Sequence, residues 1–121
     1  MRVTEPYMPW LQRVGTMMDS VLRSDVPYVR ELVDYQRMSH GKMLRPLLVL
    51  FSAMACGKDN VDTIRAAAAL ELLHNATLLH DDVVDQSLLR HNMATVNSVF
   101  SDKAAVLLGD YMLSSGLRLI T

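Results

Sequence analysis

Apolar residues fill one long, uninterrupted stretch in the middle of the chain. Residues 61–85 contain no glycine or proline and include four consecutive alanines and many leucines, which favour helix. At about 1.5 Å of rise per residue, such a helix crosses a small domain. Because it is apolar on nearly every side, we expect it to lie buried within a larger helical body.

The spacing of apolar residues predicts further helices on both sides of this stretch. Asp59 or Asn60 is expected to cap the long helix, and Gly57 to stop the helix before it. Polar residues 86–92 predict a loop, and no strand pattern is present. The predicted fold class is therefore all-α. Its remaining elements are helices at residues 6–22, 27–38 and 43–56, a short element at 95–101, and a last helix at 104–121 capped by Asp102.

The last helix is still apolar where the sequence stops at Thr121, and no later element is available to cover it. Exposed apolar patches of this kind drive association. We therefore expect residues 1–121 to be one partial domain, which either belongs to a larger bundle, associates with itself or pairs with a partner chain.

Composition excludes several classes of protein. The 121 residues, half of them hydrophobic, suffice for one small domain with a core. A net charge of −1 provides no basic field for nucleic acid. The single cysteine, Cys56, excludes an internal disulfide and fits a reducing compartment. With no signal peptide and no transmembrane segment evident, we expect a cytoplasmic protein.

Three carboxylates close the long apolar helix: Asp81, Asp82 and Asp85. The negative end of the helix dipole disfavours acids there, and Asp81 and Asp85 also repel each other across one turn. A cation would offset both effects. Mg²⁺ suits the site because it usually takes one or two carboxylates together with substrate phosphates. Asp82 is rotated by about 100° and suits a supporting role. The alternative is a solvated acidic helix end.

Basic residues form a second candidate cluster. Lys42 and Arg45 follow Gly41 at the start of a predicted helix, where free N–H groups and the dipole favour a phosphate. Arg90 follows the acids, and His74 lies two turns before Asp81 on the same helix face. Surface charge and a core histidine are the plainer alternatives. If the clusters act together, Asp81 and Asp85 should face a cavity with Lys42 and Arg45 across it.

Together these residues resemble the trans-isoprenyl (polyprenyl) diphosphate synthases. GKMLRP at 41–46 is similar to the family's GGKRxRP, and LLGDYMLSSG at 107–116 to the helix that follows its acidic motif. ELLHNATLLHDDVVD at 71–85 is similar to the first aspartate-rich motif with the preceding helix. The resemblance covers most of the chain and implies the N-terminal part of an isoprenoid-synthase-type helical bundle.

The resemblance also implies a function and roles for the residues. The chain would belong to a prenyltransferase that joins an allylic diphosphate to isopentenyl diphosphate, with Mg²⁺ as cofactor. Its catalytic acids would be Asp81 and Asp85 as metal ligands, with Asp82 supporting them. Arg90 would contact the allylic diphosphate, whereas Lys42, Arg45 and His74 would hold isopentenyl diphosphate.

Several positions depart from the family pattern. His91 stands where a second arginine contacts isopentenyl diphosphate, Asn92 replaces a glycine, and Gln86 replaces a frequent fourth acid. The second aspartate-rich motif is not in the sequence, so we expect negligible turnover by these residues alone. Other interpretations are a non-catalytic subunit of a complete synthase, a helical interaction module, or a terpene cyclase. A cyclase, however, needs no isopentenyl pocket.

Product length is expected to depend on residues one to two turns before the acids. In the family, the growing chain runs down a tunnel beside this helix, and bulky aromatic residues there stop growth early. The corresponding residues are Leu73, Ala76 and Thr77, of which the nearer two are small. This predicts a long polyprenyl product. The alternative is that small residues only let helices pack closely.

Overall fold

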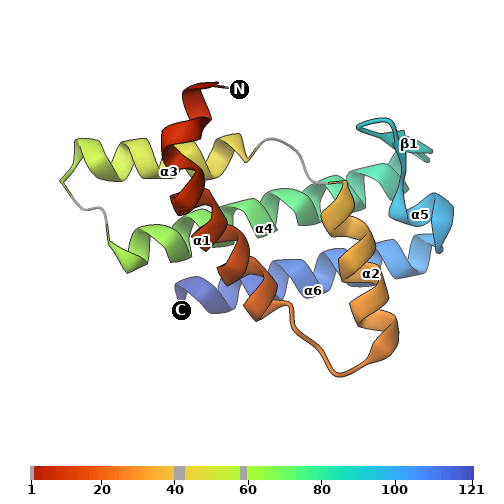
Figure 1. Ribbon diagram of the computed structural model, residues 1–121. Coiled ribbons are helices and arrows are strands. Elements are labelled where there is room, and N and C mark those ends of the chain that lie inside the picture. The colour runs from red at the N-terminus through yellow and green to blue at the C-terminus, as the bar shows by residue number, and fades with distance from the viewer. Residues whose placement is uncertain (1, 40–42, 58–59) are drawn as a thin grey trace.

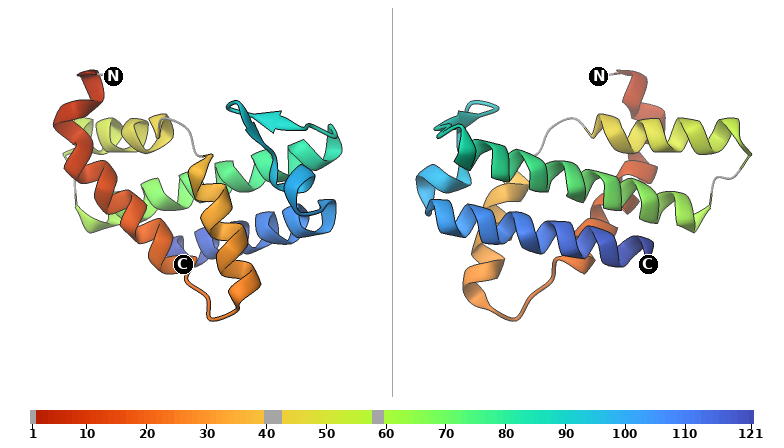
Figure 2. Two further views of the ribbon diagram at one scale, coloured as in Figure 1. Left: turned by 45° about the vertical axis from the view of Figure 1, so that its right-hand side comes forward. Right: turned by 180° about the vertical axis from the view of Figure 1, so that it is seen from behind.

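Two long helices form the centre of the protein. The computed structural model describes residues 2–39, 43–57 and 60–121. Helix α4 (Val61–Val84) and helix α6 (Asp102–Ile120) lie side by side and run antiparallel (Figures 1 and 2). The other elements are η1 (Arg2–Tyr7), α1 (Met8–Val21), α2 (Pro27–Met38), α3 (Leu44–Ala55), β1 (Leu89–Arg90), β2 (Met93–Ala94) and α5 (Val96–Val99). The predicted all-α class is confirmed, with one short hairpin added.

Small residues let α4 and α6 approach closely. A Cβ atom added to Gly116 would lie 3.2 Å from the carbonyl oxygen of Ala69, which is tighter than ordinary van der Waals contact. Large side chains fill the remaining interface, because Leu72, Leu108 and Met112 are all buried there. Of the four consecutive alanines, Ala67, Ala68 and Ala69 are buried and Ala66 is exposed. Ala69 lies against α6, whereas Ala67 and Ala68 belong to a second core cluster.

The first three helices cover this pair from other sides. Helix α1 crosses the N-terminal half of α4, where Val14 packs with Ile64 and Ala67 in a second core cluster. Helix α2 adds Leu32 and Val33 to the main core. Helix α3 lies beside the first part of α4 (Figure 2). The C-terminal half of α4 thus borders a space between α2, α3 and the hairpin.

The residues that cap the helices agree with one prediction and differ from another by one position. Asn60 caps α4, since its Oδ1 accepts a hydrogen bond from the Asp62 N–H at 2.9 Å. The other candidate cap, Asp59, lies outside the described residues. The prediction that Asp102 caps the last helix is wrong. Ser101 is the cap, because its Oγ accepts a hydrogen bond from the Ala104 N–H at 3.0 Å, and Asp102 begins the helix.

The prediction that residues 86–92 form a plain loop without strands is also wrong. Leu89 pairs with Ala94 and Arg90 with Met93 in an antiparallel hairpin. His91 and Asn92 form its two-residue turn with φ values of 52° and 62°. This left-handed conformation at both positions matches the twist of paired strands. Strands of two residues are too short to show alternation in the sequence.

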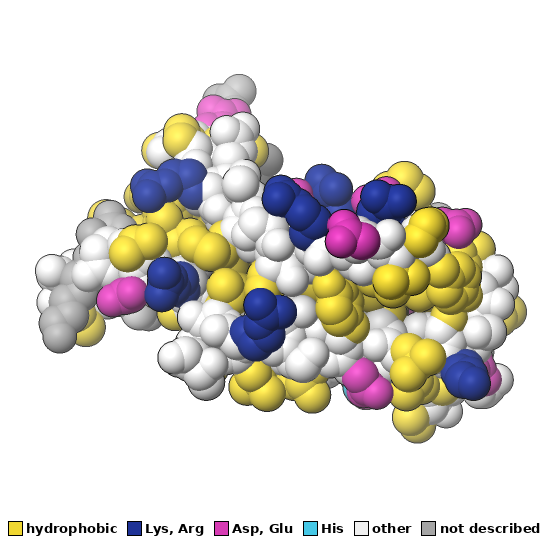
Figure 3. All heavy atoms as spheres, turned by 90° about the horizontal axis from the view of Figure 1, so that it is seen from below, with side chains coloured by type: hydrophobic (Ala, Val, Ile, Leu, Met, Phe, Trp, Pro, Cys, Tyr) yellow, Lys and Arg dark blue, Asp and Glu magenta, His cyan; other side chains and the backbone are white. Residues whose placement is uncertain are grey.

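Hydrophobic side chains remain exposed on the outer faces of the helices. Figure 3 shows such side chains on the face that includes α6. In the described part of the chain, no helix is long and apolar enough to span a membrane. Exposed apolar residues lie on α6 and α3: Val106, Leu113, Leu117 and Ile120 on the former, and Leu44, Leu48, Phe51 and Met54 on the latter.

Candidate functional site

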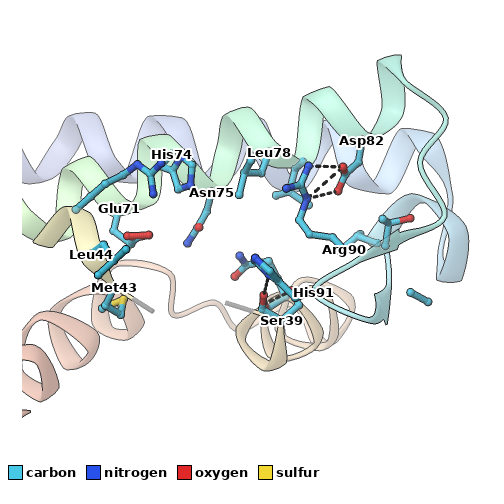
Figure 4. A pocket seen from close by; sticks show the side chains of 16 residues that line it. Ser39, Met43, Leu44, Glu71, His74, Asn75, Leu78, Asp82, Arg90 and His91 are labelled. Atoms are coloured by element: carbon cyan, nitrogen blue, oxygen red, sulfur yellow. Dashed lines mark hydrogen bonds and ion pairs between the residues drawn. The ribbon is translucent and has the colours of Figure 1, made fainter. Parts of the chain in front are cut away.

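A pocket of about 470 Å³ opens between α2, α3, α4 and the hairpin. Figure 4 shows side chains from all four elements around it. Its walls carry two arginines, two histidines and two carboxylates among otherwise uncharged residues. The lining residues are Gln36, Ser39, Met43, Leu44, Arg45, Glu71, His74, Asn75, Leu78, Leu79, Asp82, Arg90, His91, Ala94, Thr95 and Val96.

One face of α4 forms the longest wall of the pocket. Glu71, His74, Asn75, Leu78 and Asp82 all line it. Their spacing of three or four residues places them on one side of a helix. The sequence singled out both His74 and Asp82, but it placed His74 on the same helix face as Asp81. That placement is wrong, because Asp82 lines the pocket with His74 and Asp81 does not. Glu71, which lies one turn before His74, could have been found by extending the same spacing.

A bidentate ion pair lies at the C-terminal end of this wall. The Arg90 Nη2 donates to Asp82 Oδ1 at 2.7 Å, and Nε donates to Asp82 Oδ2 at 3.0 Å. The Asp82 side chain is 7% exposed and that of Arg90 is 32% exposed. The hydrogen bond with Asp82 raises the pKa of the Arg90 guanidinium, and the negative charges of Asp82, Asp81 and Asp85 also raise it. Burial of the guanidinium lowers the pKa, but it does not outweigh these effects. Arg90 therefore stays a fixed cation.

The hairpin that carries Arg90 is held to the rest of the fold by hydrogen bonds. The Ser87 N–H donates to the carbonyl oxygen of Asp82 at 2.9 Å, which closes the end of α4. The Thr95 hydroxyl donates to the Ser87 carbonyl at 2.8 Å. The Tyr35 hydroxyl donates to the Ala94 carbonyl at 2.7 Å, so α2 and the hairpin are joined directly.

His91 lies at the tip of the hairpin and reaches α2. Its Nδ1 is 3.0 Å from the carbonyl oxygen of Ser39, at the C-terminal cap of α2 (Figure 4). The contact joins two segments 52 residues apart in the sequence. His91 therefore forms part of the pocket wall opposite α4. Ser39 and Gln36 were not identified from the sequence, because nothing in a surface helix end indicates a pocket.

The electrostatic environment of the pocket is positive around His74. Burial lowers the pKa of the His74 imidazole, and the positive charges of Arg45 and Arg90 lower it further. His74 is therefore a neutral donor and acceptor at neutral pH rather than a third cation. Arg45 itself is exposed and lines the pocket from the first turn of α3. Lys42, its predicted companion, lies outside the described residues.

Asp81 and Asp85 lie beside the pocket rather than in its wall. Both are exposed, and Asp82 is the acid that lines the pocket. Asp85 is the C-cap of α4, and its N–H donates to the Asp81 carbonyl at 2.8 Å. The acids are therefore one turn apart, as the sequence predicted. Among the described residues, no three metal-ligating side chains meet. Two exposed carboxylates still fit Mg²⁺, which completes its shell with phosphate oxygens and water.

The three predicted product-length residues have different environments. Ala76 is 2% exposed and belongs to the main hydrophobic core, so it does not line the pocket. Thr77 is exposed, and its hydroxyl donates to the His74 carbonyl at 2.7 Å. Leu73 is half-buried and faces α6, since its Cδ2 would lie 3.5 Å from a Cβ atom added to Gly116.

A family model for polyprenyl synthetases matches residues 26–121. The chain is 38% identical over 112 residues to the octaprenyl diphosphate synthase of Haemophilus influenzae, which covers 93% of this chain and 34% of that enzyme. The chain therefore spans about a third of the length of such relatives.

Solved structures show the same fold. A decaprenyl diphosphate synthase from Rhodobacter capsulatus superposes with a TM-score of 0.91 at 32% identity, covering 98% of this chain and 37% of that one. A polyprenyl synthase from Caulobacter crescentus, complexed with calcium and isoprenyl diphosphate, gives a TM-score of 0.86 at 34% identity, covering 98% of this chain and 35% of that one.

Proposed function

Because this chain belongs to the polyprenyl synthetase family, we propose that residues 1–121 form the N-terminal part of a prenyltransferase domain. The reaction joins an allylic diphosphate to isopentenyl diphosphate. The allylic C–O bond breaks and pyrophosphate leaves, the isopentenyl double bond forms the new C–C bond, and a proton is lost.

The observation that supports this proposal is a polar pocket beside a pair of exposed acids. Arg45 supplies positive charge, and His74 supplies a neutral hydrogen-bonding group. This combination suits the diphosphate of isopentenyl diphosphate. The same residues would fix where the double bond lies. Lys42 belongs to this proposed set through its sequence motif.

The allylic diphosphate, in this proposal, lies at the C-terminal end of α4, between the exposed acids and Arg90. Asp81 and Asp85 would hold Mg²⁺, which when bound supplies positive charge for the departing pyrophosphate. Asp82 is placed to position rather than to ligate, since it holds the Arg90 guanidinium by three hydrogen bonds. Arg90 keeps N–H groups for the same leaving group.

A long product is the second part of the proposal. The relatives named above are octaprenyl and decaprenyl synthases, which supports a long chain here. Thr77 is small, exposed and one turn before Asp81, so it suits the wall of a product tunnel. The burial of Ala76 in the core instead supports the alternative that its small size serves helix packing.

A second candidate is a non-catalytic subunit that pairs with a complete synthase. The exposed apolar face of α6 favours it, since large apolar surfaces mark protein contacts. In either case we expect these 121 residues alone to bind substrate without turnover.

The proposed function is tested by titrating isopentenyl diphosphate into the chain in a calorimeter. We expect Arg45→Gln to weaken binding by about tenfold to a hundredfold, because it removes a charge-assisted hydrogen bond to an anion. Arg118→Gln, which removes the same charge far along α6, should change affinity by less than about twofold. Equal losses in both variants would reject a specific diphosphate site.

A further inference from the structure

Helix α4 ends in a tight turn directly after its acids. The Ser87 N–H donates to the Asp82 carbonyl at 2.9 Å, and the Gln86 N–H donates to the Val83 carbonyl at 3.2 Å. This pair of hydrogen bonds is the Schellman arrangement, in which the left-handed position is usually a glycine. Here that position is Gln86, with a φ of 53°. Because a side chain disfavours this conformation, the turn depends on contacts from other segments.

Side chains at the start of α5 provide such contacts. The Ser87 carbonyl oxygen accepts a hydrogen bond from the Thr95 hydroxyl at 2.8 Å and another from Asn97 Nδ2 at 3.0 Å. Asn97 Nδ2 also lies 3.5 Å from the Asp82 carbonyl oxygen. Both lone pairs of the Ser87 oxygen are therefore occupied, which fixes the orientation of this peptide group.

The orientation of the Asn97 amide follows from these neighbours. Its NH₂ group must face Ser87 and Asp82, because the opposite orientation would bring the amide oxygen against two carbonyl oxygens. Oδ1 then points away, is buried, and accepts no hydrogen bond from the described residues. A buried acceptor without a partner costs stability. Asn97 therefore adds little to the stability of the fold, whereas its hold on the turn is direct.

Helix α5 does not need Asn97 for its own start. The Thr95 hydroxyl caps this helix by accepting a hydrogen bond from the Ser98 N–H at 3.3 Å. Asn97 instead reaches the end of α4, which lies beside α5 (Figure 1). It does not line the pocket. Any effect of Asn97 on a ligand in the pocket must therefore pass through the turn.

We propose that Asn97 is a positioning residue, which fixes the Ser87 peptide group and through it the place of Arg90 relative to the exposed acids. Ser87 lies two residues after Asp85 and three before Arg90. The ion pair with Asp82 holds the guanidinium of Arg90, whereas Asn97 holds the backbone that leads to it. This inference rests on the proposed function, in which Mg²⁺ on the acids and Arg90 meet one diphosphate.

The test compares two ligands on the same variant. Asn97→Leu keeps nearly the same side-chain size and removes both the donors and the unpaired oxygen, so the fold should tolerate it. Calorimetric titration gives the affinity for inorganic pyrophosphate with and without Mg²⁺, and separately for isopentenyl diphosphate without metal. Asp81→Asn is the control that assigns the Mg²⁺-dependent part of pyrophosphate binding to the acids. Asn97→Ala, which cannot clash with its neighbours, takes the place of the leucine variant if that variant does not fold.

We expect Asn97→Leu to weaken the Mg²⁺-dependent binding of pyrophosphate by about tenfold, the usual effect of losing a residue that orients a metal site. Its affinity for isopentenyl diphosphate, which the proposal assigns to Arg45 and His74, should change by less than about twofold. An unchanged affinity for pyrophosphate overturns the inference and leaves the proposed function standing. Equal losses for both ligands show that Asn97 only supports the fold, and they also overturn it. If wild type shows no Mg²⁺-dependent binding that Asp81→Asn removes, the metal site of the proposed function falls together with this inference.

Discussion

At the scale of single residues, Asp82 and Arg90 set the geometry of the site. The Asp82 carboxylate is nearly buried and accepts hydrogen bonds from both Nε and Nη2 of Arg90. The Arg90 side chain still lines the pocket. The two neighbouring acids, Asp81 and Asp85, are exposed. Adjacent residues of one acidic motif thus have different environments, because one residue step rotates a side chain by about 100° around a helix. In the proposed function, Asp81 and Asp85 would hold the metal and Asp82 would position Arg90.

Replacing Asp82 with Asn should destabilise the protein. The amide keeps the shape but loses the charge, and it leaves Arg90 without its counter-ion. Because Arg90 is partly solvated, we expect a loss of about 1–3 kcal/mol in the free energy of unfolding rather than the larger cost of a fully buried pair. Chemical denaturation measures this loss.

The matched control is Asp25→Asn, which removes an exposed carboxylate from the loop before α2. It should change stability by less than about 0.5 kcal/mol. If Asp82→Asn unfolds at the same denaturant concentration as the control, the ion pair does not contribute in solution.

At the scale of elements, the α4–α6 contact depends on a glycine facing a histidine. The His80 Nε2 lies 3.1 Å from the Val106 carbonyl and 3.3 Å from Asp110 Oδ1, so the ring lies across α6. A Cβ added to Gly109 would come 2.6 Å from the His80 Cδ2, which no side chain tolerates without a shift. This contact immediately precedes Asp81 and fixes how that end of α4 lies on α6.

Gly109→Ala should therefore destabilise the wild-type protein by about 1–3 kcal/mol through overpacking. In a His80→Ala background the clash is gone. The same substitution should then be neutral or stabilising by up to about 1 kcal/mol, since alanine favours helix over glycine. Thermal and chemical unfolding of wild type, the two single variants and the double variant gives the coupling free energy between Gly109 and His80. Equal effects of Gly109→Ala in both backgrounds would show that the two residues do not contact.

The helices could be predicted from the sequence because their signals are local. The apolar run ending at Asp85, the prolines that begin helices and Asn60 as a cap are all visible within a few residues. Ser101 and Asp102 are both good caps, so the sequence alone could not decide between them. The hairpin was missed because its left-handed turn uses His91 and Asn92 in place of a glycine.

The site was predictable only in part, from the residues of α4 and from Arg90, which follows the acids closely. The sequence grouped His74 with Asp81 by their spacing of seven residues, whereas the structure places His74 with Asp82 in the pocket wall. Gln36 and Ser39 meet them only through the packing of α2, which depends on contacts such as that of Tyr35 with Ala94. Such long-range contacts leave no pattern in a local stretch of sequence.

At the scale of the whole molecule, the helices leave a polar pocket beside α4 and apolar outer faces on α3 and α6. The pocket and the acids lie at one end of α4, and exposed leucines follow α6 away from them. Relatives with this fold are about three times as long. We therefore propose that these residues bind substrate, and we expect catalysis only together with further helices.

The most direct measurement is a condensation assay on a chimera. Residues 1–121 are fused to the C-terminal two thirds of the Haemophilus influenzae octaprenyl diphosphate synthase, with that enzyme itself as the positive control. The account predicts Mg²⁺-dependent incorporation of labelled isopentenyl diphosphate into chains longer than farnesyl. Asp81→Asn and Asp85→Asn should lower this incorporation by about a hundredfold or more. A chimera that folds and binds isopentenyl diphosphate but incorporates none of it would contradict the account.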